Sequence, residues 1–175
     1  MEVRLDRAKS LIREVKDYPK TGIVFKDITP VLKDADAFSS VIEGMAENLS
    51  EAEFDYVAGI EARGFILGAA LADRMGKGFI PIRKKGKLPY STISKDYALE
   101  YGNATIEMHK DAISKGSRVI LVDDLLATGG TAKAAAELIS EAGGEVICIM
   151  FMVELESLRG RGQLGSNRVI SLMKY

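Results

Sequence analysis

The stretch from residue 119 to residue 142 constrains the fold more than any other part of the chain. The apolar run Val119–Val122 ends in two adjacent aspartates, Asp123 and Asp124, and a loop with two glycines and two threonines follows. An alanine-rich segment with helical spacing, residues 132–142, comes next. This order predicts a strand, a glycine loop and a helix, with an anion site formed by the loop amides at the helix N-terminus.

The paired aspartates indicate which kind of ligand this site suits. They repel phosphate, so they are suited to hydroxyl groups or a metal ion, and a ligand with both phosphate and hydroxyls is a sugar phosphate or a nucleotide. A P-loop is excluded, because Gly129-Gly130-Thr131-Ala132-Lys133 lacks the G-x-x-x-x-G-K-[ST] pattern. The alternative is a plain strand-to-helix turn capped by Thr128 or Thr131, which leaves the two adjacent acids unexplained.

The composition is that of a single globular domain. The chain has 175 residues, 47% of them hydrophobic, with 24 Lys and Arg against 25 Asp and Glu. This balance predicts no nucleic-acid partner, and no apolar run approaches the roughly 20 residues of a membrane helix. The single cysteine, Cys148, lies in an apolar run, which favours a buried, unreactive thiol and a reducing compartment. Residues 1–16 are charged throughout, unlike a signal peptide, so we expect a cytoplasmic protein.

Hydrophobic periodicity predicts strands that alternate with helices. Helices are expected over residues 4–17, 38–49, 65–75 and 132–142, and strands over residues 23–25, 56–60, 79–82, 105–109, 119–122, 145–153 and 169–173. Residues 84–103 hold little core material and are expected to form a long polar loop. The pattern predicts an α/β fold with a mostly parallel central sheet and helices on both faces, whose ligands bind at the carboxyl ends of the strands.

Two charged segments follow predicted strands and should lie at that same edge. Glu61-Ala62-Arg63-Gly64 places an arginine fork that suits a pyrophosphate oxygen, beside a glycine that permits close backbone approach. Arg83-Lys84-Lys85-Gly86-Lys87 offers four cations in five residues. Taken singly, the first could be a surface ion pair and the second a solvated basic loop. Their shared position favours binding of an anionic ligand.

Two further features are predicted to be structural. The segment Gly160-Arg161-Gly162-Gln163-Leu164-Gly165 has G-x-G-x-x-G spacing, but a strand pattern follows it instead of the helix that a dinucleotide-binding loop requires. It is therefore predicted to be an ordinary loop. The only histidine, His109, lies on an alternating strand without an evident partner.

Four segments resemble, in the same order along the chain, motifs of the type I phosphoribosyltransferases. The segment 119–131 resembles the family's motif for phosphoribosyl pyrophosphate (PRPP), and segments 18–32, 59–65 and 83–89 resemble those of members that act on adenine. Together the resemblance spans roughly residues 18–154. The chain departs from the pattern at Lys20, where a second proline is often found, and at Lys26, where many members have arginine.

The resemblance implies a type I phosphoribosyltransferase fold over residues 1–175, with a small hood over about residues 1–34 and a mobile lid loop over about residues 86–103. It implies transfer of the 5-phosphoribosyl group from PRPP to adenine, giving AMP and pyrophosphate in purine salvage. Mg²⁺ would be the cofactor, and the protein would be a homodimer. The alternatives are a transferase for another purine, such as hypoxanthine, guanine or xanthine, and a non-catalytic PRPP-sensing regulator.

The resemblance also assigns roles to individual residues. The 5′-phosphate and ribose of PRPP are expected to be bound by Asp123, Asp124, Leu126, Ala127, Thr128, Gly129, Gly130 and Thr131. Pyrophosphate is expected to be bound by Arg63, Arg83, Lys84 and Lys87, and adenine by Val24, Phe25 and Lys26. The lid would contribute Tyr101 and Glu100, and Glu100, Asp123 and Asp124 are the candidate catalytic residues. No strong direct metal ligand is expected, with Asp123 and Asp124 as the possible ones. Packing in the core is the alternative for Phe25, and an exposed strand edge for Glu100.

Overall fold

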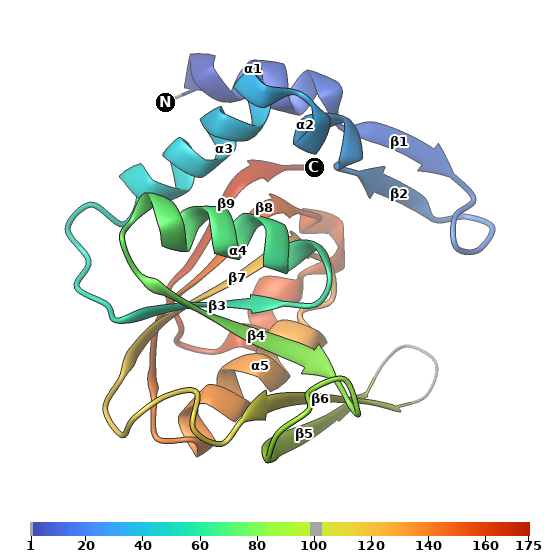
Figure 1. Ribbon diagram of the computed structural model, residues 1–175. Coiled ribbons are helices and arrows are strands. Elements are labelled where there is room, and N and C mark those ends of the chain that lie inside the picture. Colours follow the sequence, from blue (N-terminus) through green and yellow to red (C-terminus); the bar gives the residue numbers. More distant parts are fainter. Residues whose placement is uncertain (1, 99–102) are drawn as a thin grey trace.

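The computed structural model describes residues 2–98 and 103–175, among which seven strands form one sheet (Figure 1). The strand order is β5-β6-β4-β3-β7-β8-β9. The parallel part consists of β4 (Gly78–Lys84), β3 (Tyr56–Ile60), β7 (Arg118–Leu126), β8 (Glu145–Glu154) and β9 (Val169–Lys174). An antiparallel hairpin of β5 (Thr92–Ala98) and β6 (Asn103–His109) extends the β4 edge. The predicted mostly parallel sheet is confirmed.

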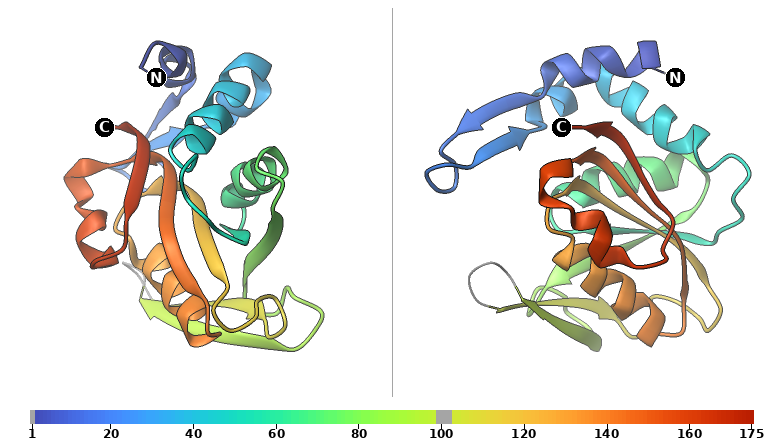
Figure 2. Two further views of the ribbon diagram at one scale, coloured as in Figure 1. Left: turned by 90° about the vertical axis from the view of Figure 1, so that its left-hand side faces the viewer. Right: turned by 180° about the vertical axis from the view of Figure 1, so that it is seen from behind.

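Helices lie on both faces of the sheet, as Figures 1 and 2 show. One face carries α1 (Glu2–Leu11), α2 (Thr29–Lys33), α3 (Ala35–Glu47) and α4 (Arg63–Arg74), and the other carries α5 (Gly130–Glu141). Along β7, Ile120 and Val122 face the first core and Leu121 faces the second. Because successive strand residues point to opposite faces, a strand buried on both sides is apolar throughout. None of the helices in the described part of the chain has the length and apolarity needed to cross a bilayer.

The N-terminal segment differs from the prediction of one helix over residues 4–17. The helix α1 ends at Leu11, and β1 (Arg13–Lys16) pairs antiparallel with β2 (Val24–Asp27). The helical prediction was wrong for residues 13–16 because their strand partner lies about ten residues further along the chain, where local periodicity does not register it. The β1–β2 hairpin projects beyond the sheet and forms a hood over its carboxyl edge (Figures 1 and 2).

Two loop boundaries also differ from the predictions. Much of the expected lid loop is the strand β5, whose seven residues pair along β6. Lid residues 99–102, which include Glu100 and Tyr101, lie outside the described residues. The strand β7 does not end before the aspartates but runs through Asp123 and Asp124 to Leu126, because β8 continues beside it as far as Glu154. The 3₁₀ helices η1 (Glu156–Leu158) and η2 (Gly160–Leu164) lie in the connection from β8 to β9.

Candidate active site

The loop that follows β7 surrounds a small cavity at the N-terminus of α5. Gly129, with a φ of +85°, precedes the first residue of the helix. The first N–H groups of a helix have no intrahelical acceptors, so a cavity here suits an anion. The cavity has a volume of about 80 Å³ and is lined by Asp123, Leu125, Leu126, Ala127, Thr128, Gly129, Gly130, Thr131, Ala132 and Phe151. The structure thus brings together the residues predicted to hold the 5′-phosphate.

The two aspartates lie beside this cavity on β7. The carboxylate Oδ2 of Asp124 is 2.8 Å from Nε of Arg63, and Oδ1 of Asp123 accepts a hydrogen bond from the N–H of Asp124 at 2.9 Å. Burial raises the pKa of Asp123 well above its ordinary value, and the charge of Asp124 adds to this. Burial raises the pKa of Asp124 as well, although Arg63 opposes the shift. These carboxyl groups disfavour further negative charge and suit the hydroxyls of a sugar.

A larger polar cavity opens where the ends of β3, β4 and β7 meet. Its volume is about 540 Å³, and its lining is Ile60, Glu61, Ala62, Arg63, Lys84, Lys85, Tyr97, Ala104, Thr105, Asp123, Asp124, Leu125 and Thr131. A Cβ atom added to Gly64 would lie 2.8 Å from the carbonyl oxygen of Val122. The predicted close approach at this glycine is therefore confirmed, and it lets α4 begin directly against β7.

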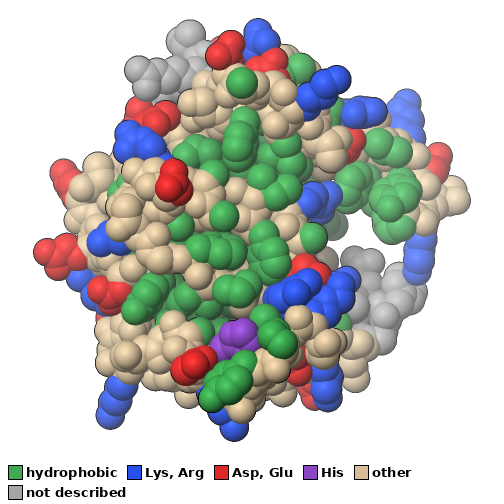
Figure 3. All heavy atoms as spheres, viewed as in Figure 1, with side chains coloured by type: hydrophobic (Ala, Val, Ile, Leu, Met, Phe, Trp, Pro, Cys, Tyr) green, Lys and Arg blue, Asp and Glu red, His purple; other side chains and the backbone are tan. Residues whose placement is uncertain are grey.

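The basic run after β4 is partly neutralised by Glu61. Oε1 of Glu61 is 3.2 Å from Nη2 of Arg83 and 3.1 Å from Nζ of Lys87. Burial favours the neutral acid, but hydrogen bonds from Arg83, the Lys84 N–H and Lys87 outweigh it and lower the pKa of Glu61 to about 2. Lys84 and Lys85 line the polar cavity, and Lys85 was absent from the predicted set. In Figure 3, Lys and Arg side chains gather beside the hollow below the hood.

We expect Glu61→Gln to weaken the dependence of stability on pH below about 4.5. The Glu61 carboxylate has a pKa of about 2, below the ordinary 4.5, so it contributes stability above pH 4.5 that is lost as the pH falls toward 2. Because Lys87 is half-exposed and its contribution is screened by water, we expect Glu61→Gln to lower the free energy of unfolding at pH 7 by about 2 kcal/mol. Urea unfolding at pH 7 and pH 3 measures it. Glu53→Gln is the control, because Glu53 is an exposed partner of Arg118; identical pH curves for all three proteins would contradict the expectation.

An apolar cavity adjoins the polar one beneath the hood. Its volume is about 390 Å³, and its lining is Ile23, Val24, Phe25, Lys26, Ala98, Leu125, Ala127, Thr128, Gly130, Thr131, Leu155 and Leu158. The three residues predicted to meet the base, Val24, Phe25 and Lys26, are among them. The side chains of Leu125, Leu155 and Leu158 were not predicted, since apolar residues at strand ends carry no local signal that separates a site from a core. A cavity of this lining suits a flat heterocycle.

The hood is tied to the body of the protein by contacts of Phe25 and Lys26. The Arg63 guanidinium carbon lies 5.0 Å from the centroid of the Phe25 ring. The Lys26 ammonium pairs with the Glu14 carboxylate and lies 4.0 Å from the ring centroid of Tyr175. The charge of Lys26 is thus engaged by Glu14 of the hood and by the ring of Tyr175.

The remaining candidates stay outside the site. Cys148 is buried on β8, which confirms its predicted burial, and this burial raises the pKa of its thiol to about 11. His109 packs edge-on against Tyr90, with ring centroids 6.1 Å apart. The G-x-G-x-x-G segment was predicted to be a loop but forms the 3₁₀ helix η2. The prediction that a strand follows it instead of a helix is confirmed, because β9 comes next. Among the described residues, no three His, Cys, Asp or Glu side chains are grouped to hold a metal ion.

Known proteins that are similar to this chain in sequence and in structure identify its family. Residues 29–163 match the phosphoribosyl transferase domain family. The adenine phosphoribosyltransferase of Caldanaerobacter subterraneus subsp. tengcongensis is 56% identical over 98% of this chain and 99% of its own length. The crystal structure of the adenine phosphoribosyltransferase from Thermoanaerobacter pseudethanolicus superposes with a TM-score of 0.96, at 54% identity over 98% of this chain and 99% of that one. The Saccharomyces cerevisiae adenine phosphoribosyltransferase, crystallised with an imino-altritol bisphosphate and adenine, gives 0.93 at 36% identity over 98% of this chain and 99% of its own. The chain therefore belongs to the phosphoribosyltransferase family, and within it to the adenine phosphoribosyltransferases.

Proposed function

We propose that the protein transfers the 5-phosphoribosyl group of PRPP to adenine, giving AMP and pyrophosphate. The observation that carries this proposal is that the polar and apolar cavities share a wall, formed by Leu125 and Thr131. A sugar held by the aspartates places its anomeric carbon at this shared wall, next to a flat base in the apolar cavity. Two substrates that must react with each other are thereby brought together.

The residues of the site divide the work of this reaction. The loop from Leu126 to Thr131 holds the 5′-phosphate with its amides and hydroxyls, and Asp123 and Asp124 hold the ribose hydroxyls. The anomeric carbon gains positive character as its bond to pyrophosphate breaks. Arg63, Lys84 and Lys85 offset the charge of the departing pyrophosphate, assisted by Arg83 and Lys87 once these exchange their contacts with Glu61. Glu100 is the proposed group that accepts the proton that adenine loses as its ring nitrogen bonds to the anomeric carbon.

A Mg²⁺ ion is proposed to enter the site together with PRPP. The donor set fits an ion brought by the substrate, because the described residues hold no cluster of three ligating side chains and Mg²⁺ retains several waters in such sites. Asp123 or Asp124 would supply a single oxygen at most. When bound, the ion supplies positive charge that offsets the pyrophosphate. Lys84 and Lys85 supply the protein's own positive charge on that cavity wall.

We further propose a homodimer in the cytoplasm, without nucleic-acid or membrane partners. The family resemblance supports the dimer, and Ile66 on α4 is an exposed apolar side chain of the kind that subunit interfaces bury. The near balance of charges supports the absence of a polyanionic partner. The free, buried Cys148 supports a reducing compartment. Sedimentation velocity of the purified protein tests the oligomeric state.

Side-by-side assays of four purines test the proposed function. The purified protein is incubated with PRPP, Mg²⁺ and either adenine, hypoxanthine, guanine or xanthine, and release of pyrophosphate is measured. Adenine should exceed the other bases in kcat/KM by about 100-fold or more, since unpaired polar groups on the wrong base are costly. Equal rates with hypoxanthine would favour the alternative purine transferase, and PRPP binding without consumption of any base would favour a regulator.

A further inference from the structure

The connection between β8 and β9 contributes to both halves of the site. Leu155 and Leu158 line the apolar cavity. Gly160 packs directly beneath the phosphate loop: a Cβ atom added there would lie 2.1 Å from the carbonyl oxygen of Ala127. Conversely, a Cβ atom on Gly129 would lie 2.4 Å from the carbonyl oxygen of Gly160. The two backbones touch without room for a side chain, so the position of Gly160 sets the position of the loop.

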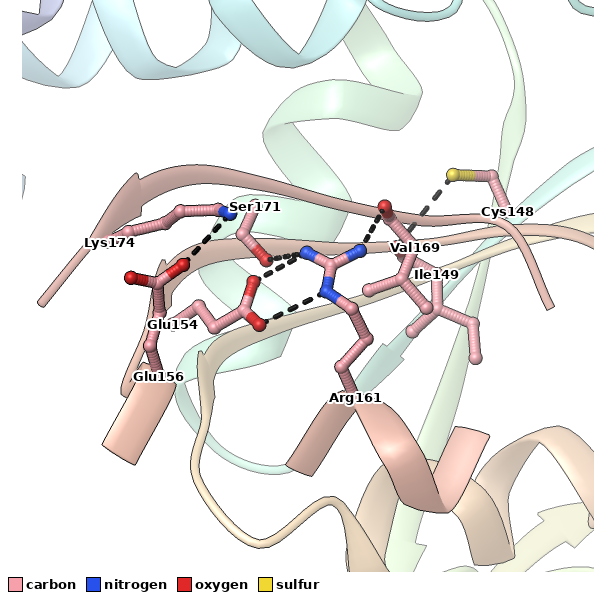
Figure 4. A network of polar contacts seen from close by, with 8 residues as sticks. All are labelled: Cys148, Ile149, Glu154, Glu156, Arg161, Val169, Ser171 and Lys174. Carbon is pink, nitrogen blue, oxygen red and sulfur yellow. Dashed lines mark hydrogen bonds and ion pairs between the residues drawn. The ribbon is translucent and has the colours of Figure 1, made fainter. Parts of the chain in front are cut away.

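Arg161, the residue after Gly160, closes this connection with a network of hydrogen bonds (Figure 4). Its Nε and Nη2 donate to Oε1 and Oε2 of Glu154 at 3.1 and 2.5 Å. Its Nη1 donates to the carbonyl oxygen of Val169 at 2.8 Å, and Nη2 also approaches Oγ of Ser171 at 3.4 Å. Glu154, at the end of β8, is only 5% exposed. The guanidinium therefore ties η2 to the ends of two neighbouring strands.

We propose that Arg161 and Glu154 are positioning residues for the phosphoribosyl group, because their bidentate pair holds Gly160 against the 5′-phosphate loop. The inference rests on the proposed function only in taking this loop as the phosphate site. A planar guanidinium serves the carboxylate and the Val169 carbonyl together, in one fixed orientation. An ammonium in its place keeps the charge but cannot satisfy these acceptors in that geometry, so Gly160 loses its fixed position. This gives the G-x-G-x-x-G segment a role in the site that its spacing did not predict.

The first test compares Arg161→Lys with Arg74→Lys. Arg74 is a matched control because it forms the same fork with Glu43, at 2.6 and 2.9 Å, between α4 and α3 and away from the cavities. Binding of ribose 5-phosphate is measured by calorimetry, together with the two KM values and the Tm. Arg161→Lys should weaken ribose 5-phosphate binding and raise KM for PRPP about 10-fold, with KM for adenine changed less than about 3-fold. Arg74→Lys should leave ribose 5-phosphate binding and both KM values unchanged. Equal ligand binding in the two variants would overturn the proposal.

A second test examines the backbone contact itself. Gly160→Ala introduces the clash with Ala127, whereas Gly162→Ala is the control because a Cβ atom there meets nothing within 4 Å. Gly160→Ala should weaken ribose 5-phosphate binding about 10-fold or more relative to Gly162→Ala. Equal binding would overturn the proposal even if Arg161→Lys failed to fold.

These binding measurements need no turnover, so they separate the two claims. A wild-type protein that binds ribose 5-phosphate but consumes no adenine would remove the proposed function and leave this inference standing. A wild-type protein that does not bind ribose 5-phosphate would overturn this inference.

Discussion

Asp124→Asn should lower kcat by about 100- to 1,000-fold, the usual cost of removing one preorganised electrostatic group from an active site. Asp124 is buried at the wall of the polar cavity, with its carboxylate 2.8 Å from Nε of Arg63. In the proposed reaction this carboxylate faces the ribose while positive charge develops at the anomeric carbon. An amide of the same shape fills the space but contributes no negative charge there. Initial rates with saturating adenine and PRPP measure the effect.

The variant should remain folded, which separates catalysis from stability. Because burial raises the pKa of Asp124, its charged form is costly in the folded state, and the amide removes that cost. The Arg63 guanidinium that loses its partner is one-third exposed, so water can solvate it. The Tm should therefore change by only a few degrees. Asp73→Asn, at an exposed position of α4, is the control for the substitution itself. Wild-type rates in Asp124→Asn would remove the catalytic role.

The central βα unit could be predicted from the sequence because its signals are local. The apolar run of β7, the glycine loop and the alanine-rich α5 follow one another, and each has its own period or turn residue. The position of the end of β7 could not be predicted in the same way. Asp123 and Asp124 look like a strand terminus, but β8 supplies pairing partners as far as Leu126. Pairing with a distant strand overrides a local polar signal.

In the hood and the lid, strand pairing likewise decides the structure where the local sequence pattern does not predict it. The residues of β1 have helical spacing with α1, yet their partner β2 turns them into a hairpin. In β5 the half-buried face carries Ile93, Lys95 and Tyr97, so a lysine interrupts the apolar alternation and the segment resembles a polar loop in the sequence. The predicted roles of Glu100 and Tyr101 stay predictions, since these residues lie outside the described part of the chain.

Within the site, the positions of charged residues could be predicted better than those of apolar residues. Strand-end cations and acids are conspicuous in a sequence, and the structure gathers Arg63, Lys84 and both aspartates around one cavity. That Glu61 engages Arg83 and Lys87 could not be foreseen, because it depends on the angle at which the turn after β4 folds back. Gly160 gave no functional signal, since its importance comes from the backbone of a loop about thirty residues earlier.

Phe25→Ala should raise KM for adenine by about 10- to 100-fold and change KM for PRPP by less than about 3-fold. Stacking of a base on an aromatic ring contributes about 1–3 kcal/mol by alanine substitution. Phe25 lines the apolar cavity but not the polar one, so the loss should fall on one substrate. Steady-state kinetics with each substrate varied in turn measure the two constants.

Two variants separate stacking from the packing of the hood. Phe25→Leu keeps apolar volume without an aromatic face, so its KM for adenine should lie between those of the wild type and Phe25→Ala. Tyr18→Ala removes the ring that packs edge-on against Phe25 at 5.3 Å but does not line the cavity, and its effect should be smaller still. If Tyr18→Ala and Phe25→Ala raised KM for adenine equally, the hood would act only by closing over the site. A ring that contacts only adenine should change only the KM for adenine. If Phe25→Ala raised both KM values alike, the proposed stacking of Phe25 on adenine would be contradicted.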